Sequence, residues 1–186
     1  MSALSPGFTD AGQAQKCFRA ILQAMSFPGR PVNLGVVLEA PAGLSQAAAA
    51  VLLTLADPSV GVHLQDPRAA DWLAFHAGAR LAGADIADFV VAATRPHLAD
   101  LATGSDDEPE NGATLLLEVA TLETGPRLRL TGPGIETELV AALPLDAEFV
   151  AEWQTMSAHA PCGVDVLLCA GDRLLALPRS LKLETA

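Results

Sequence analysis

The sequence predicts a single α/β domain over residues 1–186, built as three α/β/α layers with a mixed β-sheet between two layers of helices. The first observation is an alternation between segments with helical apolar spacing and short apolar runs of strand length. The second is a pair of hairpin signals, which favour antiparallel as well as parallel strands in the sheet. The third is composition: 51% of the residues are hydrophobic and 18% are charged, which is typical of a chain with a large buried core.

The first two helices are predicted from their caps and apolar faces. Thr9 or Asp10 can cap a helix over residues 10–25, because a short side-chain oxygen accepts free N–H groups of the first turn. The face expected to be buried carries apolar residues at i, i+3, i+4 spacing: Cys17, Phe18, Ile21, Leu22 and Met25. Pro28-Gly29 ends this helix. A second helix covers residues 45–56, where alanines favour helix and allow close packing, and Asp57-Pro58 stops it.

The middle of the chain continues the alternation. Residues 61–64 and 89–92 are apolar runs of strand length. Between them, Asp66-Pro67 is typical of an N-cap followed by proline at the first helical position, and the helix that follows ends by Gly78. A short helix over residues 97–101 is expected after the second strand.

The last third contains the two hairpin signals. Residues 113–122 form the clearest strand, and after a turn at 123–126 the strand 128–131 is expected to return beside it. A helix over residues 146–158 then buries its apolar face, made of Phe149, Val150, Trp153 and Met156. Strands at 164–169 and 174–177 flank Ala170-Gly171-Asp172, which predicts a second hairpin.

Charge excludes some classes of partner. The formal net charge is −11, so binding to free nucleic acid is not expected. Part of the negative charge lies in residues 105–110, which are expected to form a solvated loop. No apolar run is long enough to suggest a membrane span, and no secretory signal is visible, so no membrane partner is expected.

The cysteines favour a reducing compartment. Cys17, Cys162 and Cys169 are odd in number and lack the paired spacing of a zinc site, so reduced thiols in a cytoplasmic protein and no bound metal are expected. Cys17 lies on the apolar stripe of the first helix and is expected to belong to the core.

A loop after the strand 128–131 is a candidate anion-binding site. Gly132-Pro133-Gly134 forms a sharp loop whose backbone N–H groups can point the same way, and such a concave set of donors can bind an anion. Arg129 alternates with Leu128 and Leu130, so its side chain is expected on the opposite face of the strand, and Thr131 leads into the loop. The alternative is a plain loop between two strands.

Two charged residues near the end of the chain are further candidates. Asp165 opens a strand just past a glycine, where its carboxylate can orient an arginine or a bound ribose, or cap a local turn. Arg179 follows the last hairpin and suits bidentate phosphate recognition, or else forms a surface ion pair of little energetic weight. The four histidines are expected to be structural, because none shows the i, i+4 pairing of a helical metal site.

Several kinds of catalytic site are absent from the sequence. Pyridoxal phosphate needs a lysine for its Schiff base, and neither Lys16 nor Lys182 falls in a loop suited to that cofactor. No Gly-Lys-Ser/Thr phosphate loop and no Gly-x-Ser-x-Gly elbow occurs. We therefore expect no cofactor bound by this chain, and no complete catalytic set of residues is visible.

Six short blocks, taken together in their order, resemble the PhnH subunit family of the bacterial carbon–phosphorus lyase system. Each block is apolar or turn-forming and is not diagnostic alone, but their joint order spans nearly the whole chain. The blocks are Phe18-Arg19 with 24–29, then 52–57, 112–115, 128–135, 163–165 and 174–179. Relatives tend to carry Phe-Pro where this chain has Ala160-Pro161, and two threonines where it has Ser180-Leu181.

The resemblance implies a fold similar to the large domain of pyridoxal-phosphate-dependent transferases. It implies a subunit that works with PhnG, PhnI and PhnJ, is inactive alone, and forms a homodimer when isolated. The complex would attach a phosphonate to the ribose carbon of MgATP and displace adenine, which gives a ribose 1-phosphonate 5-triphosphate. The alternative is a stand-alone enzyme or binding protein for a small phosphorylated metabolite, with the 132–134 loop as its phosphate site.

Overall fold

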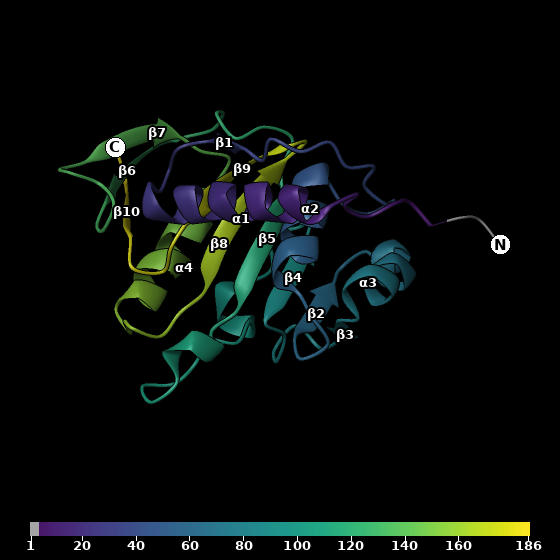
Figure 1. Ribbon diagram of the computed structural model, residues 1–186. Helices are drawn as coiled ribbons and strands as arrows, with labels where there is room; N and C mark the ends of the chain where they lie inside the picture. The colour runs from purple at the N-terminus through teal and green to yellow at the C-terminus, as the bar shows by residue number, and fades with distance from the viewer. Residues whose placement is uncertain (1–3) are drawn as a thin grey trace.

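The computed structural model describes residues 4–186 and shows a mixed seven-stranded sheet with a smaller sheet beside it (Figure 1). The strand order of the large sheet is β1-β9-β8-β5-β4-β2-β3. Its strands are β1 (Val32–Asn33), β2 (Gly61–Leu64), β3 (Arg80–Leu81), β4 (Phe89–Ala92), β5 (Thr114–Glu118), β8 (Asp165–Ala170) and β9 (Arg173–Leu177). From β8 to β3 the neighbours are parallel, whereas β8–β9 and β9–β1 are antiparallel, so the predicted mixed sheet and the hairpin at residues 164–177 are confirmed.

Four α-helices occur where the sequence predicts helix. They are α1 (Ala11–Ser26), α2 (Gln46–Leu55), α3 (Ala70–Ala77) and α4 (Ala147–Ser157). Asp10, Ser45 and Asp146 cap α1, α2 and α4 by accepting a first-turn N–H group. Asp66 and Pro67 instead begin a short 3₁₀ turn, η1 (Pro67–Ala69), which leads directly into α3. The short helix expected at 97–101 is likewise a 3₁₀ turn, η2 (Leu98–Asp100).

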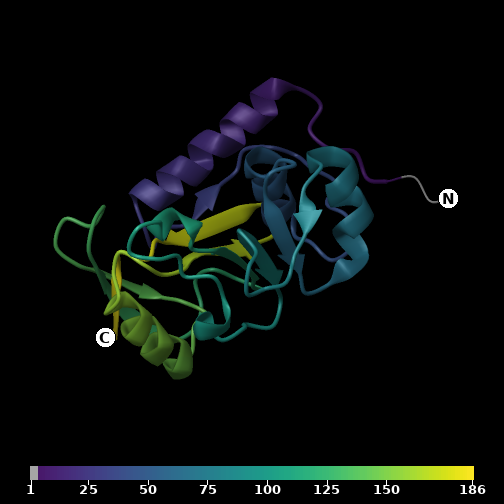
Figure 2. The same ribbon diagram turned by 90° about the horizontal axis from the view of Figure 1, so that it is seen from below.

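The large sheet separates two buried clusters. Alternate residues of the central strands point to opposite faces, so Leu116 and Leu167 join the cluster under α1, α2 and α3, while Leu115 and Val166 join the cluster under α4. Because both faces are covered, the central strands are continuous apolar runs. Figure 2 shows α1 and α4 on opposite sides of the sheet, which is the predicted three-layer arrangement.

The layer that contains α4 also contains a small antiparallel sheet, which corrects one prediction. Strand β6 (Arg127–Thr131) lies between β7 (Leu139–Ala142) and β10 (Lys182–Thr185) in the order β10-β6-β7. The prediction that this strand returns beside 113–122 is wrong, because β5 already has β4 and β8 on its two edges. Leu128 and Leu130 bury their side chains toward α4 instead, and Arg129 is exposed as predicted.

The buried face of α1 is narrower than predicted. Cys17 and Ile21 are buried, together with two alanines, and Met25 is half-buried. Phe18 and Leu22 are 50% and 55% exposed, so the prediction that they join the core is wrong. Their spacing is helical, but it places them on the solvent side of α1. No helix among residues 4–186 is long and apolar enough to cross a membrane.

Candidate functional site

Asp165 and Arg179 form the best-defined polar contact among the predicted site residues. Asp165 begins β8, and Arg179 lies just beyond β9, so the hairpin between these strands brings the two together. The Asp165 carboxylate accepts hydrogen bonds from the Arg179 backbone N–H at 2.8 Å, from Nε at 3.1 Å and from Nη2 at 2.7 Å. Both side chains are 17% exposed. Asp165 therefore orients an arginine, which is one of the roles that the sequence left open.

The same guanidinium also holds the segment before β5. Its Nη1 donates to the carbonyl oxygen of Pro109 at 2.6 Å, and its Nη2 donates to that of Gly112 at 3.3 Å. A side chain at residue 112 would collide with Arg179 and with the carbonyl oxygen of Gly163. Gly112 is thus required because backbone and guanidinium approach each other closely at this point. Arg179 binds the chain itself through most of its donors and is neither an open phosphate site nor a loose surface ion pair.

The predicted anion-binding loop is packed against other parts of the chain. Gly132 and Gly134 have φ values of 134° and 83°, and the N–H group of Ile135 donates to the carbonyl oxygen of Gly132. Gly132 lies against the backbone of residues 180–181, and Gly134 lies against Ser26 and Pro28. Two of the blocks noted in the sequence, 24–29 and 128–135, therefore contact each other.

The arginines near this loop do not share one carboxylate. Arg129 pairs with Glu138 at 3.3 Å, whereas Arg179 pairs with Asp165. Thr131 ends β6 and lies opposite Lys182 of β10. The structure therefore brings Asp165 and Arg179 together and places Gly132 beside the residues that follow Arg179, while Arg129 is held by a different carboxylate.

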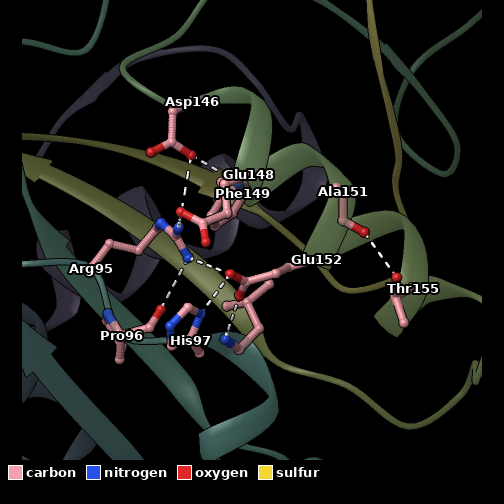
Figure 3. A network of polar contacts seen from close by, with 10 residues as sticks. Arg95, Pro96, His97, Asp146, Glu148, Phe149, Ala151, Glu152 and Thr155 are labelled. Atoms are coloured by element: carbon pink, nitrogen blue, oxygen red, sulfur yellow. Dashed lines mark hydrogen bonds and ion pairs between the residues drawn. The ribbon is translucent and has the colours of Figure 1, made fainter.

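A second polar cluster, which we call the Arg95 network, lies at the start of α4 (Figure 3). Arg95 donates to Glu152 at 2.9 Å and to Glu148 at 3.0 Å, and its Nη2 lies 3.8 Å from Asp146. Nδ1 of His97 lies 2.9 Å from the same oxygen of Glu152, Oε1. The other oxygen of Glu152 accepts the N–H group of Leu98 at 2.8 Å, so this carboxylate ties η2 to α4.

These contacts shift pKa values in the network, including those of His97 and Glu152. The hydrogen bond to Glu152 and its negative charge raise the pKa of His97 above its ordinary value. Partial burial alone would raise the pKa of Glu152, but the Leu98 N–H, His97 and Arg95 outweigh it and leave that pKa lowered. Both shifts favour the charged forms of the pair, a carboxylate and an imidazolium, relative to the free side chains.

The Arg95 network contains a group of residues that could hold a metal ion. His97, Glu148 and Glu152 each offer one ligand atom, and these atoms lie within 4.8 Å of one another. However, the Arg95 guanidinium already donates to both carboxylates, and its positive charge opposes a second cation at the same oxygens. The sequence reasoning missed this cluster. The i, i+4 spacing of Glu148 and Glu152 on a helix was a visible signal, but nothing local pointed to Arg95 or His97 as their partners.

A cavity of about 1000 Å³ adjoins the Arg95 network. Its walls are η2, the loop 103–106, the outer side of α4 and the segment 159–163. Gly163 is part of the wall and lies against both Met156 and Arg179, so the cavity borders the Asp165–Arg179 pair. His159 and Ala160 line it as well, whereas the 132–134 loop does not.

A smaller cavity of about 300 Å³ lies at the carboxyl ends of β2, β4 and β5. Parallel α/β sheets bind ligands at this edge. Glu118 lines the cavity and accepts the backbone N–H of Ser45, the N-cap of α2, at 2.7 Å. Burial raises the pKa of the Glu118 carboxyl, and its hydrogen bonds to Ser45 offset only part of that effect.

Comparison with known proteins adds a family match over nearly the whole chain. A family model described as "Bacterial phosphonate metabolism protein (PhnH)" matches residues 6–184. A Rhizobium meliloti (strain 1021) protein named alpha-D-ribose 1-methylphosphonate 5-triphosphate synthase subunit PhnH is 35% identical over 181 residues, covering 92% of this chain and 90% of that protein. A Stutzerimonas stutzeri protein named putative C-P lyase subunit protein HtxG is 37% identical over 175 residues, covering 91% of this chain and 85% of that protein.

Proposed function

Because the chain belongs to the PhnH family of bacterial phosphonate metabolism proteins, we propose that it is a subunit of a carbon–phosphorus lyase complex. The observation that carries the proposal is the match to two relatives, both named as subunits, over nine-tenths of this chain. The complex makes a ribose 1-phosphonate 5-triphosphate from MgATP and a phosphonate, displaces adenine, and so acts as a transferase during phosphonate catabolism.

The local chemistry supports a role in binding and assembly. The charged side chains that the structure gathers are largely satisfied by one another: Arg179 by Asp165, and Arg95 by Glu148 and Glu152. A general base or nucleophile would need a free functional atom beside a reacting group. The chain is therefore proposed to be inactive alone and to work with PhnG, PhnI and PhnJ. Its three free cysteines suit the reducing cytoplasm.

We also propose where nucleotide would approach. The proposed contacts are Arg129, Thr131, Gly132, Gly134, Asp165 and Arg179, which include the two arginines and the glycine loop. For Arg179 to bind a phosphate, the phosphate oxygens would have to replace the Asp165 carboxylate. Arg129 is 44% exposed and pairs with an exposed Glu138, so it is the easier of the two for a phosphate to capture.

The chain is proposed to bind no pyridoxal phosphate, although its fold is proposed to be similar to the large domain of transferases that use it. Lys16 is exposed on α1 and Lys182 is exposed on β10, and neither lines the two cavities described above. A Schiff base needs a lysine inside the cofactor pocket. Borohydride treatment with pyridoxal phosphate present should therefore leave no reduced adduct on either lysine.

Co-expression tests the proposed function. The tagged chain, produced with PhnG, PhnI and PhnJ, should recover all three in constant ratio, and only the complex should release adenine from MgATP and a phosphonate. Recovery of the chain alone, or turnover of a phosphorylated metabolite by the pure chain, would instead support the stand-alone alternative.

A further inference from the structure

We propose that the cavity beside α4, bounded by η2, the loop 103–106 and the segment 159–163, receives a basic segment of a partner subunit. The inference rests on the proposed function, because it needs a complex in which this chain is one member. It assigns a docking site to a concave surface outside the predicted nucleotide residues.

The cavity is large enough for a stretch of polypeptide. Its volume of about 1000 Å³ is at the upper end of the range for small-molecule pockets, about 300–1,000 Å³. Its walls are η2, the loop 103–106, α4 and the segment 159–163, so an inserted segment would be contacted from several sides.

The charge of the cavity selects a basic occupant. Asp106 lies on the loop wall, while Glu148 and Glu152 lie on the α4 wall, and no lysine or arginine is among the described residues that line the cavity. Arg95 supplies one positive charge from behind, against Glu148, Glu152 and Asp146, and His97 in the lining supplies at most one more, beside Glu152. The four carboxylates named here therefore face at most two positive charges. Carboxylate charge thus remains in excess, which repels a triphosphate or phosphonate and attracts lysine or arginine.

Two of these carboxylates still have acceptor capacity. Glu148 binds Arg95 through Oε2, and Asp106 accepts only the Cys162 thiol, through Oδ1 at 3.6 Å. Among the described residues, no hydrogen-bond partner occupies the second oxygen of either carboxylate. Each can therefore accept a charge-assisted hydrogen bond from an incoming guanidinium or ammonium group.

The rest of the lining suits the aliphatic part of such side chains. Ala99, Ala151 and Ala160 line the cavity and are exposed, so they contribute apolar surface to it. Lysine and arginine bury their methylene stems on apolar surface while the charged ends reach polar partners. An acidic rim around an apolar floor is complementary to a basic segment, whereas a purely apolar ligand would leave the carboxylates without a cation.

Charge reversal tests the docking site. Asp106→Lys/Glu148→Lys reverses the two carboxylates that have free oxygens, and it should lower recovery of the partner subunits in the co-expression experiment at least about tenfold. Asp85→Lys/Glu123→Lys is the matched control. Glu123 is 62% exposed and pairs with Arg173 at 3.1 Å, just as Glu148 is 65% exposed and pairs with Arg95 at 3.0 Å. Asp85 is exposed like Asp106, and neither control residue lines the cavity.

The outcomes separate this inference from the proposed function. Loss of partners with the first pair only, at unchanged thermal stability of the purified chain, supports docking in the cavity. Equal recovery with both pairs would overturn the docking site and leave the proposed function standing. Failure of the unmodified chain to recover any partner would overturn the proposed function and the docking site together.

Cys162 gives a second readout without a charge change. It lines the cavity and is partly exposed, whereas Cys17 and Cys169 are buried. Alkylation by a maleimide, followed by mass spectrometry of the Cys162 peptide, should be at least about tenfold slower in the complex than in the isolated chain. Equal rates would contradict docking there. Protection of Cys162 by spermine alone, with normal assembly of the charge-reversed chain, would show a site for small cations and would also overturn the inference.

Discussion

At the scale of single residues, Arg179 joins three parts of the chain that are far apart in sequence. Its guanidinium binds Asp165 at the start of β8 and two carbonyl oxygens in the segment before β5. An exposed arginine would lose these contacts at little cost in free energy. Here, however, the side chains of Arg179 and Asp165 are both only 17% exposed. Removing one partner of such a pair leaves the other charge without compensation.

Arg179→Ala should therefore destabilise the chain strongly. We expect a loss of about 3 kcal/mol in the free energy of unfolding, because the Asp165 carboxylate and the carbonyl oxygens of Pro109 and Gly112 lose their donor. Urea denaturation of the purified chain measures it. The control is Arg129→Ala, which removes a 44% exposed arginine from one exposed partner and should cost less than about 1 kcal/mol. Equal losses in the two variants would show that the Asp165–Arg179 pair is no more than a surface contact.

His97 makes stability depend on pH. Its pKa is raised in the folded chain by Glu152, so the stabilisation is fully present below the unfolded pKa of about 6.5 and is lost as pH rises through the higher folded pKa. His97→Gln should thus lower the melting temperature more at pH 5.5 than at pH 8.5, by less than about 4 °C because the His97 side chain is exposed. In a Glu152→Gln background the same substitution should have no such pH dependence. If it keeps the dependence there, another group is responsible.

The candidate site residues show which side-chain contacts can be predicted from local sequence and which cannot. Asp165 could be selected because it opens a strand just past Gly163, and Arg179 because it follows Pro178 after the last strand of the hairpin. Their pairing also follows from the predicted hairpin. Arg95 and Glu152 could not be paired in this way, because 57 residues separate them and η2 has no apolar periodicity that would orient it against α4.

At the scale of elements, the contact between the 132–134 loop and the end of α1 fixes the small sheet to the large one. Gly29 donates its N–H to Ala176 of β9, and Leu130 and Leu139 of β6 and β7 lie against its Cα. Gly134 in turn lies against Ser26 and Pro28. The turn after α1 is thus held between both sheets, and it brings the blocks 24–29 and 128–135 into contact.

Gly134→Ala should break this contact. Gly134 has a φ of 83°, and an added Cβ would collide with the carbonyl oxygen of Ser26, so strain and overlap together should cost about 3–4 kcal/mol. Gly171→Ala is the control, because Gly171 has a φ of 59° with no atom within 4 Å of the added Cβ. It should cost only about 1–2 kcal/mol. Equal losses in urea denaturation would mean that backbone strain, rather than the contact with α1, accounts for the effect.

The sequence predicts well the elements that have local signals. The small sheet shows why other elements are not predicted. Capping residues and apolar spacing locate all four helices, and apolar runs locate β2, β4, β8 and β9. The partners of β6 lie both nearby, in β7, and about 50 residues away, in β10. The side chains of β7 are all half-buried, so no alternation between apolar and polar residues distinguishes that strand. Local turn chemistry at 123–126 predicted the wrong neighbour because pairing depends on which sheet edges are free.

At the scale of the whole molecule, the described surface carries exposed apolar side chains on several segments, among them two helices. Phe18 and Leu22 are exposed on α1, and Phe75 is exposed on α3 at 72%. On the outer side of α1 the two apolar side chains stand one turn apart, beside the exposed Arg19. A helix that exposes large apolar residues to solvent is suited to an interface.

The isolated chain is proposed to form a homodimer, and α1 is where we expect the contact. Light scattering at micromolar concentration should give about twice the chain mass of 19.2 kDa. Phe18→Asp should shift the mass toward the monomer with little change in melting temperature, because this side chain is half-exposed within the single chain. Phe75→Asp is the matched control and should leave the dimer intact.

A monomeric mass for the unmodified chain would contradict the homodimer proposal. A dimer that survives Phe18→Asp but not Phe75→Asp would place the interface at α3 instead of α1. Since the docking cavity lies beside α4, on the opposite side of the large sheet, neither substitution should alter alkylation of Cys162.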